Sequence, residues 1–209
     1  MSRRFINAIK RPIVGLTGPT GAGKGFVSDY LVKLGCYVSD TDKIAREITM
    51  KDSPFLGILA ENFGKDIIDE KGELKRKLLA ERAFCNKENQ MLLNSLMHPE
   101  IIRISTGRCK EALENGARAA IIDAPLLFEA EGDRYCDTVI AVVAPEEIRT
   151  ERIMARDNIT SEQAQSRISV QHCDDFYTSK SEFTVRSYEP FDIEDELRGF
   201  AEKYLGQVK

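Results

Sequence analysis

A short glycine-rich stretch near the N-terminus constrains the fold of this chain more than any other feature. It reads GPTGAGKG from Gly18 to Gly25, follows the apolar run 13–17, and precedes a helical pattern that extends to about residue 34. Strand, glycine turn, lysine and helix in this order are typical of a loop that binds nucleotide phosphates. Glycine lets successive backbone N–H groups approach the oxyanions, and Lys24 adds a positive charge for the outer phosphates. We therefore predict a nucleotide-binding segment made of Gly18, Pro19, Thr20, Gly21, Ala22, Gly23, Lys24, Gly25 and Phe26.

The residue after the lysine departs from the usual pattern of such loops. That pattern has Ser or Thr at this position, where the hydroxyl contacts Mg²⁺. This chain has Gly25 instead. A nucleotide site built on this loop therefore lacks one customary metal ligand.

Five short apolar runs alternate with helical patterns along the chain. We expect strands near residues 13–17, 36–39, 119–123, 138–144 and 183–185, and their alternation with helices favours a parallel sheet covered on both faces. Between residues 43 and 115 the apolar residues recur at helical spacing in segments 55–63, 75–84, 88–97 and 101–114, and His98-Pro99 is expected to separate the last two. Such a long helical run between strands indicates an inserted helical subdomain. Further helices are expected from about residue 146, from a capped start at Thr160, and over 193–205.

Composition and charge argue against several classes of protein. The formal net charge of −4 disfavours a protein that coats nucleic acid. No apolar run approaches the roughly 20 residues that cross a bilayer, and the basic N-terminus leads into Lys10-Arg11-Pro12 rather than into the apolar region of a signal peptide. The five cysteines are scattered without CxxC spacing, which favours reduced thiols and argues against a zinc site. We expect a cytoplasmic protein, a monomer or small homo-oligomer, without nucleic-acid or membrane partners.

Carboxylates follow two of the expected strands. Asp40 and Asp42 come after the second apolar run, and Asp123 ends the third. Because ligands of open α/β sheets bind at the carboxyl ends of the strands, these groups are candidates for chemistry. A carboxylate of the first pair could accept a proton from an attacking hydroxyl, and Asp123 could organise Mg²⁺ through bound water. The alternatives are a helix N-cap with a surface neighbour for the pair, and a plain strand end for Asp123.

Arginines recur at helical spacing after the fourth expected strand. Arg149, Arg152 and Arg156 lie on roughly one helix face, which could close over a triphosphate and stabilise charge on a transferring phosphoryl group. A solvated helix face is the alternative for these arginines. For His98, before Pro99, the alternative to a binding role is a helix-breaking packing residue.

Several motifs together resemble the dephospho-CoA kinase family. They are GLTG at 15–18 with GAGK at 21–24, DTDKIARE at 40–47, His98-Pro99, DAPLLFE at 123–129, and RIMARD at 152–157 with SEQA at 161–164 and RISVQ at 167–171. They occur in the family's order and span nearly the whole chain. The phosphate loop alone is shared by many enzymes, whereas the second and fourth motifs in combination are much more specific.

This resemblance implies transfer of the γ-phosphoryl group of ATP to the ribose 3′-hydroxyl of dephospho-CoA, the last step of CoA synthesis, with Mg²⁺ as cofactor. ATP and dephospho-CoA are then the small-molecule partners. The implied fold is an α/β phosphate-loop NTPase fold like that of nucleoside-monophosphate kinases, a parallel five-stranded sheet of order 2-3-1-4-5. The expected single domain covers residues 10–209, with a core over about 10–50 and 116–209, a helical CoA-binding insertion over about 51–115, and a lid over about 146–175.

By matching position, the resemblance also implies roles for individual residues. Asp42 is the implied general base, and Lys24, Arg152 and Arg156 stabilise the transferring group. Arg149 and Ser187 lie near the nucleotide, and Asp123 faces the metal through water. The implied contacts to the acceptor come from Asp42, Arg46, His98, Asp123, Pro125, Leu126, Leu127 and Phe128.

The chain departs from the family pattern at four places. Gly25-Phe26 replaces a Ser/Thr pair, Ser187 stands where the family often has Asn, Arg149 stands where it often has Gln, and the stretch 174–177 is unusual. Adenylate kinases also have glycine after the lysine, so magnesium held mainly by phosphates and water remains feasible. Two alternatives stay open: another small-molecule or nucleotide kinase on this fold, and a nucleotide-binding relative without catalysis. A GTPase is disfavoured because no NKxD motif occurs.

Overall fold

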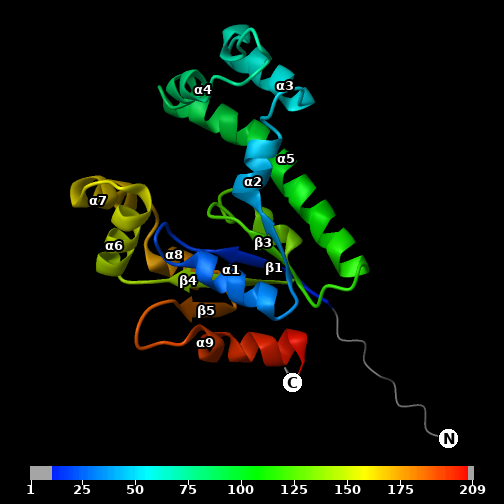
Figure 1. The fold of residues 1–209 in the computed structure, drawn as a ribbon, viewed down its shortest axis with the longest axis vertical. Coiled ribbons are helices and arrows are strands. Elements are labelled where there is room, and N and C mark those ends of the chain that lie inside the picture. The colour runs from blue at the N-terminus through cyan, green and yellow to red at the C-terminus, as the bar shows by residue number, and fades with distance from the viewer. Residues whose placement is uncertain (1–10, 207–209) are drawn as a thin grey trace, which may run out of the picture. The chain divides into compact units, whose positions relative to one another are not determined.

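Five strands form one sheet in the computed structural model, which describes residues 11–206 (Figure 1). The strands are β1 Ile13–Thr17, β2 Tyr37–Asp40, β3 Ala120–Asp123, β4 Thr138–Val143 and β5 Phe183–Arg186. Their order is β2-β3-β1-β4-β5, and β1 pairs in parallel with both β3 and β4. This confirms the expected strand order and fold class. The expectation about a signal peptide falls on the first ten residues and lies outside the described range.

Both faces of the sheet are covered, which explains why its strands are continuously apolar. On one face, Val14 and Leu16 pack with side chains of the helices α1 Lys24–Lys33 and α9 Ile193–Phe200. On the other face, Ile13 and Ile122 pack with Cys109 and with the segment after β3. Ligands of such covered sheets bind at the carboxyl ends of the strands.

The remaining helices lie between and after these strands. Their bounds are α2 Thr41–Glu47, α3 Pro54–Phe63, α4 Arg76–Ala83, α5 Lys87–Glu114, α6 Glu146–Asp157, α7 Ser161–Ser169 and α8 Asp174–Thr178. The capping box expected at Thr160 is present, with reciprocal bonds between Thr160 and Gln163. The pair α6 and α7 shares a small core of its own around Ile153, Ala164 and Ile168 (Figure 1).

The chain divides into two compact units. Within the described range, one unit comprises residues 11–39 and 108–206 and contains most of the sheet, and the other comprises residues 40–107. We call them the nucleotide unit and the helical unit. The helical unit has its own core, in which Ile44, Leu59 and Ile67 are fully buried. The domain, insertion and lid boundaries drawn from the sequence stay predictions.

The expected helix break at His98-Pro99 is wrong. The single helix α5 runs through this position from Lys87 to Glu114 with Pro99 inside it. An internal proline removes one backbone hydrogen bond and costs about 3 kcal/mol. Apolar side chains before and after it pack against the core of the helical unit, among them Leu93, Met97 and Ile101. This burial offsets the cost, so proline does not end the helix.

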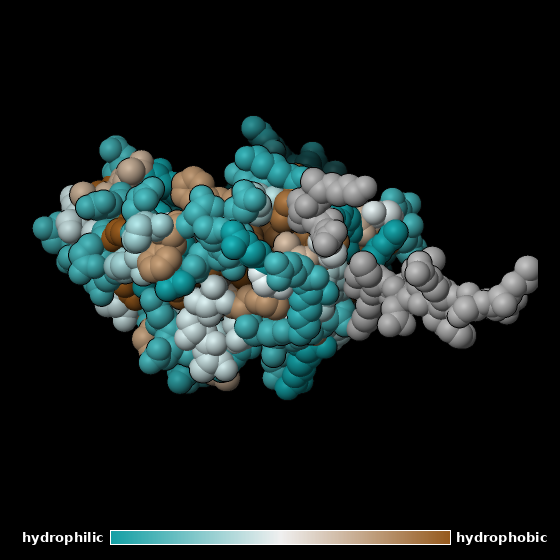
Figure 2. Space-filling model, turned by 90° about the horizontal axis from the view of Figure 1, so that it is seen from below, coloured by the Kyte–Doolittle hydropathy of each residue, from teal (hydrophilic) through white to brown (hydrophobic). Residues whose placement is uncertain are grey.

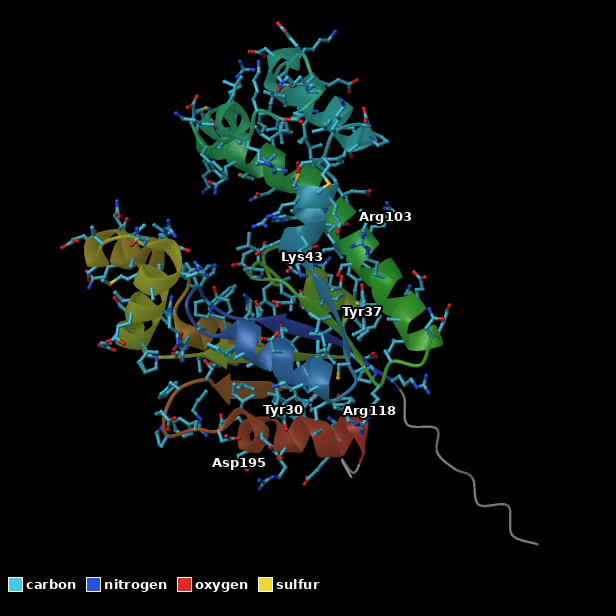
Figure 3. The ribbon with its side chains drawn as sticks, in the orientation of Figure 1. Tyr30, Tyr37, Lys43, Arg103, Arg118 and Asp195 are labelled. Carbon is cyan, nitrogen blue, oxygen red and sulfur yellow. The ribbon has the colours of Figure 1, made fainter. Side chains whose placement is uncertain are left out.

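A half-buried arginine connects three segments of the nucleotide unit. Arg118, labelled in Figure 3, donates hydrogen bonds to the carbonyl oxygens of Leu34 and Leu205. Leu34 caps α1, and Leu205 lies in the short π-helical turn after α9. The interaction fixes the ends of both helices on the same face of the sheet.

The thiols and the surface agree with a reduced globular chain. All five cysteines are free, with Cys36 and Cys109 buried and Cys85 and Cys173 exposed. Burial raises the pKa of Cys36 to about 11 and that of Cys136 to about 12. The face drawn in Figure 2 is largely hydrophilic with scattered hydrophobic residues. Among the described residues, no helix is both long and apolar enough to cross a membrane.

Candidate active site

The glycine-rich loop connects β1 directly to α1, as expected. Gly23 precedes the first helical turn with φ +94°, and Gly18 leaves the strand with φ +146°. A Cβ at Gly18 would collide with the backbone oxygen of Val142 in the neighbouring strand β4. Glycine is therefore required here both by conformation and by the close approach of two backbones.

Alanine substitutions at two glycines of the loop test whether the requirement for glycine is specific to Gly18. Gly18→Ala is expected to lower the free energy of unfolding by about 1–3 kcal/mol, because the methyl group forces the loop away from β4. Gly25→Ala is the matched control, since a Cβ there meets nothing within 4 Å. It should raise stability by about 0.4–1 kcal/mol through the unfolded chain. Urea unfolding measures both changes, and equal effects would contradict the strained role of Gly18.

The tip of the loop is held from behind by Arg149 and Gln171. Arg149 is buried, and its Nε donates to the carbonyl oxygen of Thr20 at 3.0 Å. Gln171 Oε1 accepts from the backbone N–H of Thr20 at 3.0 Å and from Arg149 Nη2 at 3.1 Å. Asp174 lies 3.7 Å from Arg149 Nη1, and burial raises the pKa of its carboxyl group. Arg149 thus lies beneath the loop and supports its backbone.

Arg152 and Ser187 form a second support under the same loop. Arg152 Nη1 donates to the carbonyl oxygen of Gly21 at 3.2 Å and to Ser187 Oγ at 3.1 Å. The Ser187 hydroxyl in turn donates to the carbonyl oxygen of Ala22. The Arg152 guanidinium also lies 5.8 Å from the centre of the Phe26 ring. The structure therefore brings Arg152, Ser187 and Phe26 together at the loop.

Arg156 takes part in an ion-pair cluster at the junction of α6 and α7. Asp157 pairs with Arg156 at 2.8 Å and also with Arg167 of the next helix. The hydrogen bond from Arg156, with further contributions from Arg167, lowers the pKa of Asp157 to about 2. The cluster ties the two helices together at the end of α6, where Asn158 adopts a left-handed conformation.

This cluster predicts a pH dependence of stability. A carboxyl group whose pKa is lowered on folding stabilises the fold above its unfolded pKa, near 3.9, and this contribution is lost as the pH falls towards 2. Asp157→Asn should therefore lower the melting temperature at pH 6–8 and have a much smaller effect near pH 2. Glu151→Gln at an exposed position of α6 is the control. An Asp157→Asn effect that persists undiminished at pH 2 would contradict the ion-pair explanation.

The carboxylate of Asp123 lies at the end of β3 beside the start of α1. Lys24 Nζ lies 3.8 Å from Asp123 Oδ1, and the hydroxyl of Ser28 donates to Asp123 Oδ2 at 2.8 Å. Among the described residues, no group of three or more His, Cys, Asp or Glu side chains could hold a metal ion. Mg²⁺ in kinases uses one or two carboxylates with substrate phosphates and water, and Asp123 fits that requirement.

The segment after β3 is fixed to the sheet and to α8. Ala124 donates its N–H to the carbonyl oxygen of Leu16, Leu127 is fully buried, and Leu126 is half exposed. The Phe128 ring meets the Phe176 ring edge-on at 5.8 Å. Lys180 Nζ lies 3.6 Å from the centre of the Phe176 ring, and the His172 ring stacks on the Phe176 ring with 3.7 Å between the ring centres. The unusual stretch 174–177 thus forms short helix α8, which the sequence analysis missed.

In the helical unit, Asp40 and Asp42 have different positions at the start of α2. Asp40 is the N-cap, and its Oδ1 accepts hydrogen bonds from the N–H groups of Asp42 and Lys43 at 2.9 and 3.0 Å. Asp42 is exposed and lines a cavity of about 310 Å³ together with three polar residues, Arg46, Thr49 and Arg76, and seven apolar ones. His98 lies in α5. A carboxylate is therefore presented at the rim of a largely apolar cavity.

Two residues that support the candidate site were missed in the sequence. Ser28 lies in the middle of a helical pattern, where a serine is ordinarily a solvated or neutral position. Gln171 was noted only as part of a motif, and its contact with Thr20 joins residues 151 positions apart. A one-turn spacing from Lys24 could have pointed to Ser28, whereas no local pattern points to Gln171.

Comparisons with known proteins identify the family of this chain. Residues 12–187 match the family model described as dephospho-CoA kinase. A protein of Corynebacterium glutamicum named dephospho-CoA kinase is 38% identical over 172 residues, which cover 82% of this chain and 86% of that relative. Two solved structures are similar at 26% identity. TT1252 from Thermus thermophilus has a TM-score of 0.75 and covers 96% of this chain and all of its own, and dephospho-CoA kinase from Campylobacter jejuni has 0.66 with 94% and 98% covered. On these grounds the chain belongs to the dephospho-CoA kinase family.

Proposed function

We propose a division of roles among the residues of this dephospho-CoA kinase, which transfers a phosphoryl group from ATP to dephospho-CoA in the final step of CoA synthesis. The observation that carries the proposal is the position of Lys24. Its ammonium group lies 3.8 Å from Asp123 at the end of β3, and Lys24 is the first residue of the helix that follows the glycine loop. A lysine placed there can neutralise the outer phosphates of ATP.

The loop 18–26 binds the phosphates through its backbone N–H groups. Arg149 supports the loop from beneath, because its guanidinium is buried and bonded to the Thr20 carbonyl. Arg152 and Arg156 stabilise the transferring phosphoryl group, and they leave their present partners Ser187 and Asp157 to do so. Such a change exchanges ion pairs and hydrogen bonds for contacts with phosphate oxygens, which are of similar strength.

Asp42 accepts the proton of the ribose 3′-hydroxyl in this proposal. Its carboxylate is exposed and lines the cavity of the helical unit, and a carboxylate can act as general base when it reaches the attacking hydroxyl. Arg46 and His98 of the same unit, and Pro125, Leu126, Leu127 and Phe128 after β3, contact the acceptor. The helical unit binds the CoA moiety.

Magnesium bound with ATP would supply positive charge against the charge that develops on the phosphates. Asp123 would hold the ion through water, because its carboxylate lies 3.8 Å from the Lys24 ammonium group that faces the phosphates in this proposal. We further propose that the enzyme acts in the cytoplasm, as a monomer or small homo-oligomer, without a nucleic-acid partner.

A coupled assay of ADP release tests the proposed activity. Purified protein with ATP and Mg²⁺ should release ADP rapidly with dephospho-CoA as acceptor, and only slowly with nucleoside monophosphates or shikimate. Mass spectrometry should show that dephospho-CoA gains one phosphoryl group, and fragmentation should place that group on the ribose 3′-oxygen, as in CoA. A preference for another acceptor would indicate a different small-molecule kinase. ATP binding without acceptor-dependent ADP release would indicate a relative that has lost catalysis.

A further inference from the structure

Two residues of the first helix, Lys24 and Ser28, contact the carboxylate of Asp123. Lys24 and Ser28 are four positions apart in α1, so their side chains lie on the same face of the helix. Lys24 Nζ lies 3.8 Å from Oδ1 of Asp123, while Ser28 Oγ donates to Oδ2 at 2.8 Å. The Ser28 side chain is buried. Each carboxylate oxygen therefore faces a different residue of the same helix.

The position after the lysine, which normally supplies a hydroxyl beside the metal, is a glycine in this chain and has no side chain. Gly25 follows the lysine, and a Cβ built on it meets nothing within 4 Å. Phe26 cannot replace the hydroxyl, since its ring is apolar and 60% exposed. Ser28 lies three positions after Gly25, and thus near the same helix face. It is the hydroxyl of α1 that reaches Asp123.

Lys24 cannot pair fully with Asp123 and with the nucleotide phosphates at the same time. When ATP occupies the loop, the lysine is drawn to the phosphates, which carry more charge than one carboxylate. The hydrogen bond from Ser28 involves no group that the phosphates need, so it persists in the nucleotide complex. A carboxylate held in this way keeps its orientation when the lysine moves.

We propose that Ser28 is a positioning residue for Mg²⁺, which fixes the orientation of the Asp123 carboxylate and so compensates for the missing hydroxyl at Gly25. The proposal rests on the role proposed above for Asp123. Residues that orient a metal-facing group typically contribute about 10–100-fold to metal affinity or activity. Ser28 should therefore affect the Mg²⁺-dependent part of nucleotide binding and leave the Mg²⁺-independent part unchanged.

Binding of a fluorescent ADP analogue to the full chain tests this proposal. Mg²⁺ is titrated at fixed analogue concentration, and a parallel measurement in EDTA gives binding without metal. For Ser28→Ala we expect the half-maximal Mg²⁺ concentration to rise about 10-fold or more, with unchanged affinity in EDTA. Unchanged Mg²⁺ dependence, or an equal loss of affinity in EDTA, would overturn the proposal. Ser28→Cys, which keeps the volume but weakens the donor, replaces the alanine variant if that variant does not fold.

A double-mutant cycle tests whether Ser28 acts through Asp123. It adds the variant Asp123→Asn and the double variant that combines it with Ser28→Ala. If Ser28 acts through Asp123, Ser28→Ala should have no further effect on the Mg²⁺ titration once Asp123 is asparagine. An undiminished effect in the double variant would show that Ser28 acts by another route, against the proposal. If Asp123→Asn itself leaves the Mg²⁺ titration unchanged, the proposed role of Asp123 fails. If only Ser28→Ala leaves it unchanged, the failure is confined to Ser28.

Discussion

Asp42→Asn is expected to lower kcat about 10²–10⁴-fold, the usual contribution of a general base. The substitution keeps the size of the side chain and its place in the first turn of α2, but its amide cannot accept the proton of the ribose hydroxyl. Because Asp42 is proposed to act on the reaction rather than on binding, the KM values for ATP and dephospho-CoA should stay close to those of the wild type. Steady-state assays with both substrates varied measure the separation.

Asp40→Asn is the matched control for this prediction. Asp40 is only two residues away, but its carboxylate oxygen caps the backbone of α2, and asparagine caps helices nearly as well. It should therefore retain most of the wild-type turnover. An equal loss in both variants would indicate that negative charge at the start of α2 matters rather than proton acceptance. Near-wild-type turnover of Asp42→Asn, with both substrates still bound, would remove Asp42 from the role of base.

Lys24→Met is expected to lower kcat/KM about 10²–10³-fold, the typical cost of removing one preorganised electrostatic contact to a reacting group. Methionine keeps much of the aliphatic length of lysine but loses the charge that faces both Asp123 and the phosphates. Lys24→Arg should restore little of the activity, because the planar guanidinium is larger than the ammonium group and has different donor geometry. ADP release at saturating dephospho-CoA, with ATP varied, measures the effect.

The control for Lys24→Met is Lys33→Met in the last turn of the same helix. Lys33 is exposed, so its replacement should leave the kinetic constants nearly unchanged. Thermal melting of both variants distinguishes loss of catalysis from loss of the fold. Full activity of a folded Lys24→Met protein would contradict the assignment of the phosphate loop.

The sequence was a good guide wherever the determining interactions are local. The apolar strands, the glycine turn at 18–25, and the capping box at Thr160 depend on neighbouring residues and were predicted correctly. The N-cap role weighed for the Asp40 and Asp42 pair is also a local interaction, and the structure assigns it to Asp40. The resemblance to the family then predicted the strand order that the sheet has.

The wrong helix break at Pro99, and several contacts that the sequence did not predict, depend on interactions between distant residues. Pro99 reads locally as a break, but apolar side chains on either side of it pack against the core of the helical unit, and α5 continues. Arg149 and Ser187 were predicted beside the nucleotide, and nothing in their surroundings along the chain indicates that they bond to the carbonyls of Thr20 and Ala22. Such contacts depend on the completed fold, as does the bond between Ser28 and Asp123.

The distribution of thiols gives each of the two units an exposed cysteine that can carry a label without engineering. Cys85 belongs to the helical unit and Cys173 to the nucleotide unit, and both are exposed. Cys36 and Cys109 are buried, and the raised pKa of Cys136, about 12, keeps its thiol protonated at neutral pH. Maleimide dyes at pH 7 should therefore react first at Cys85 and Cys173. A donor and an acceptor on this native pair would report, by energy transfer, how far ATP and dephospho-CoA change the separation of the units.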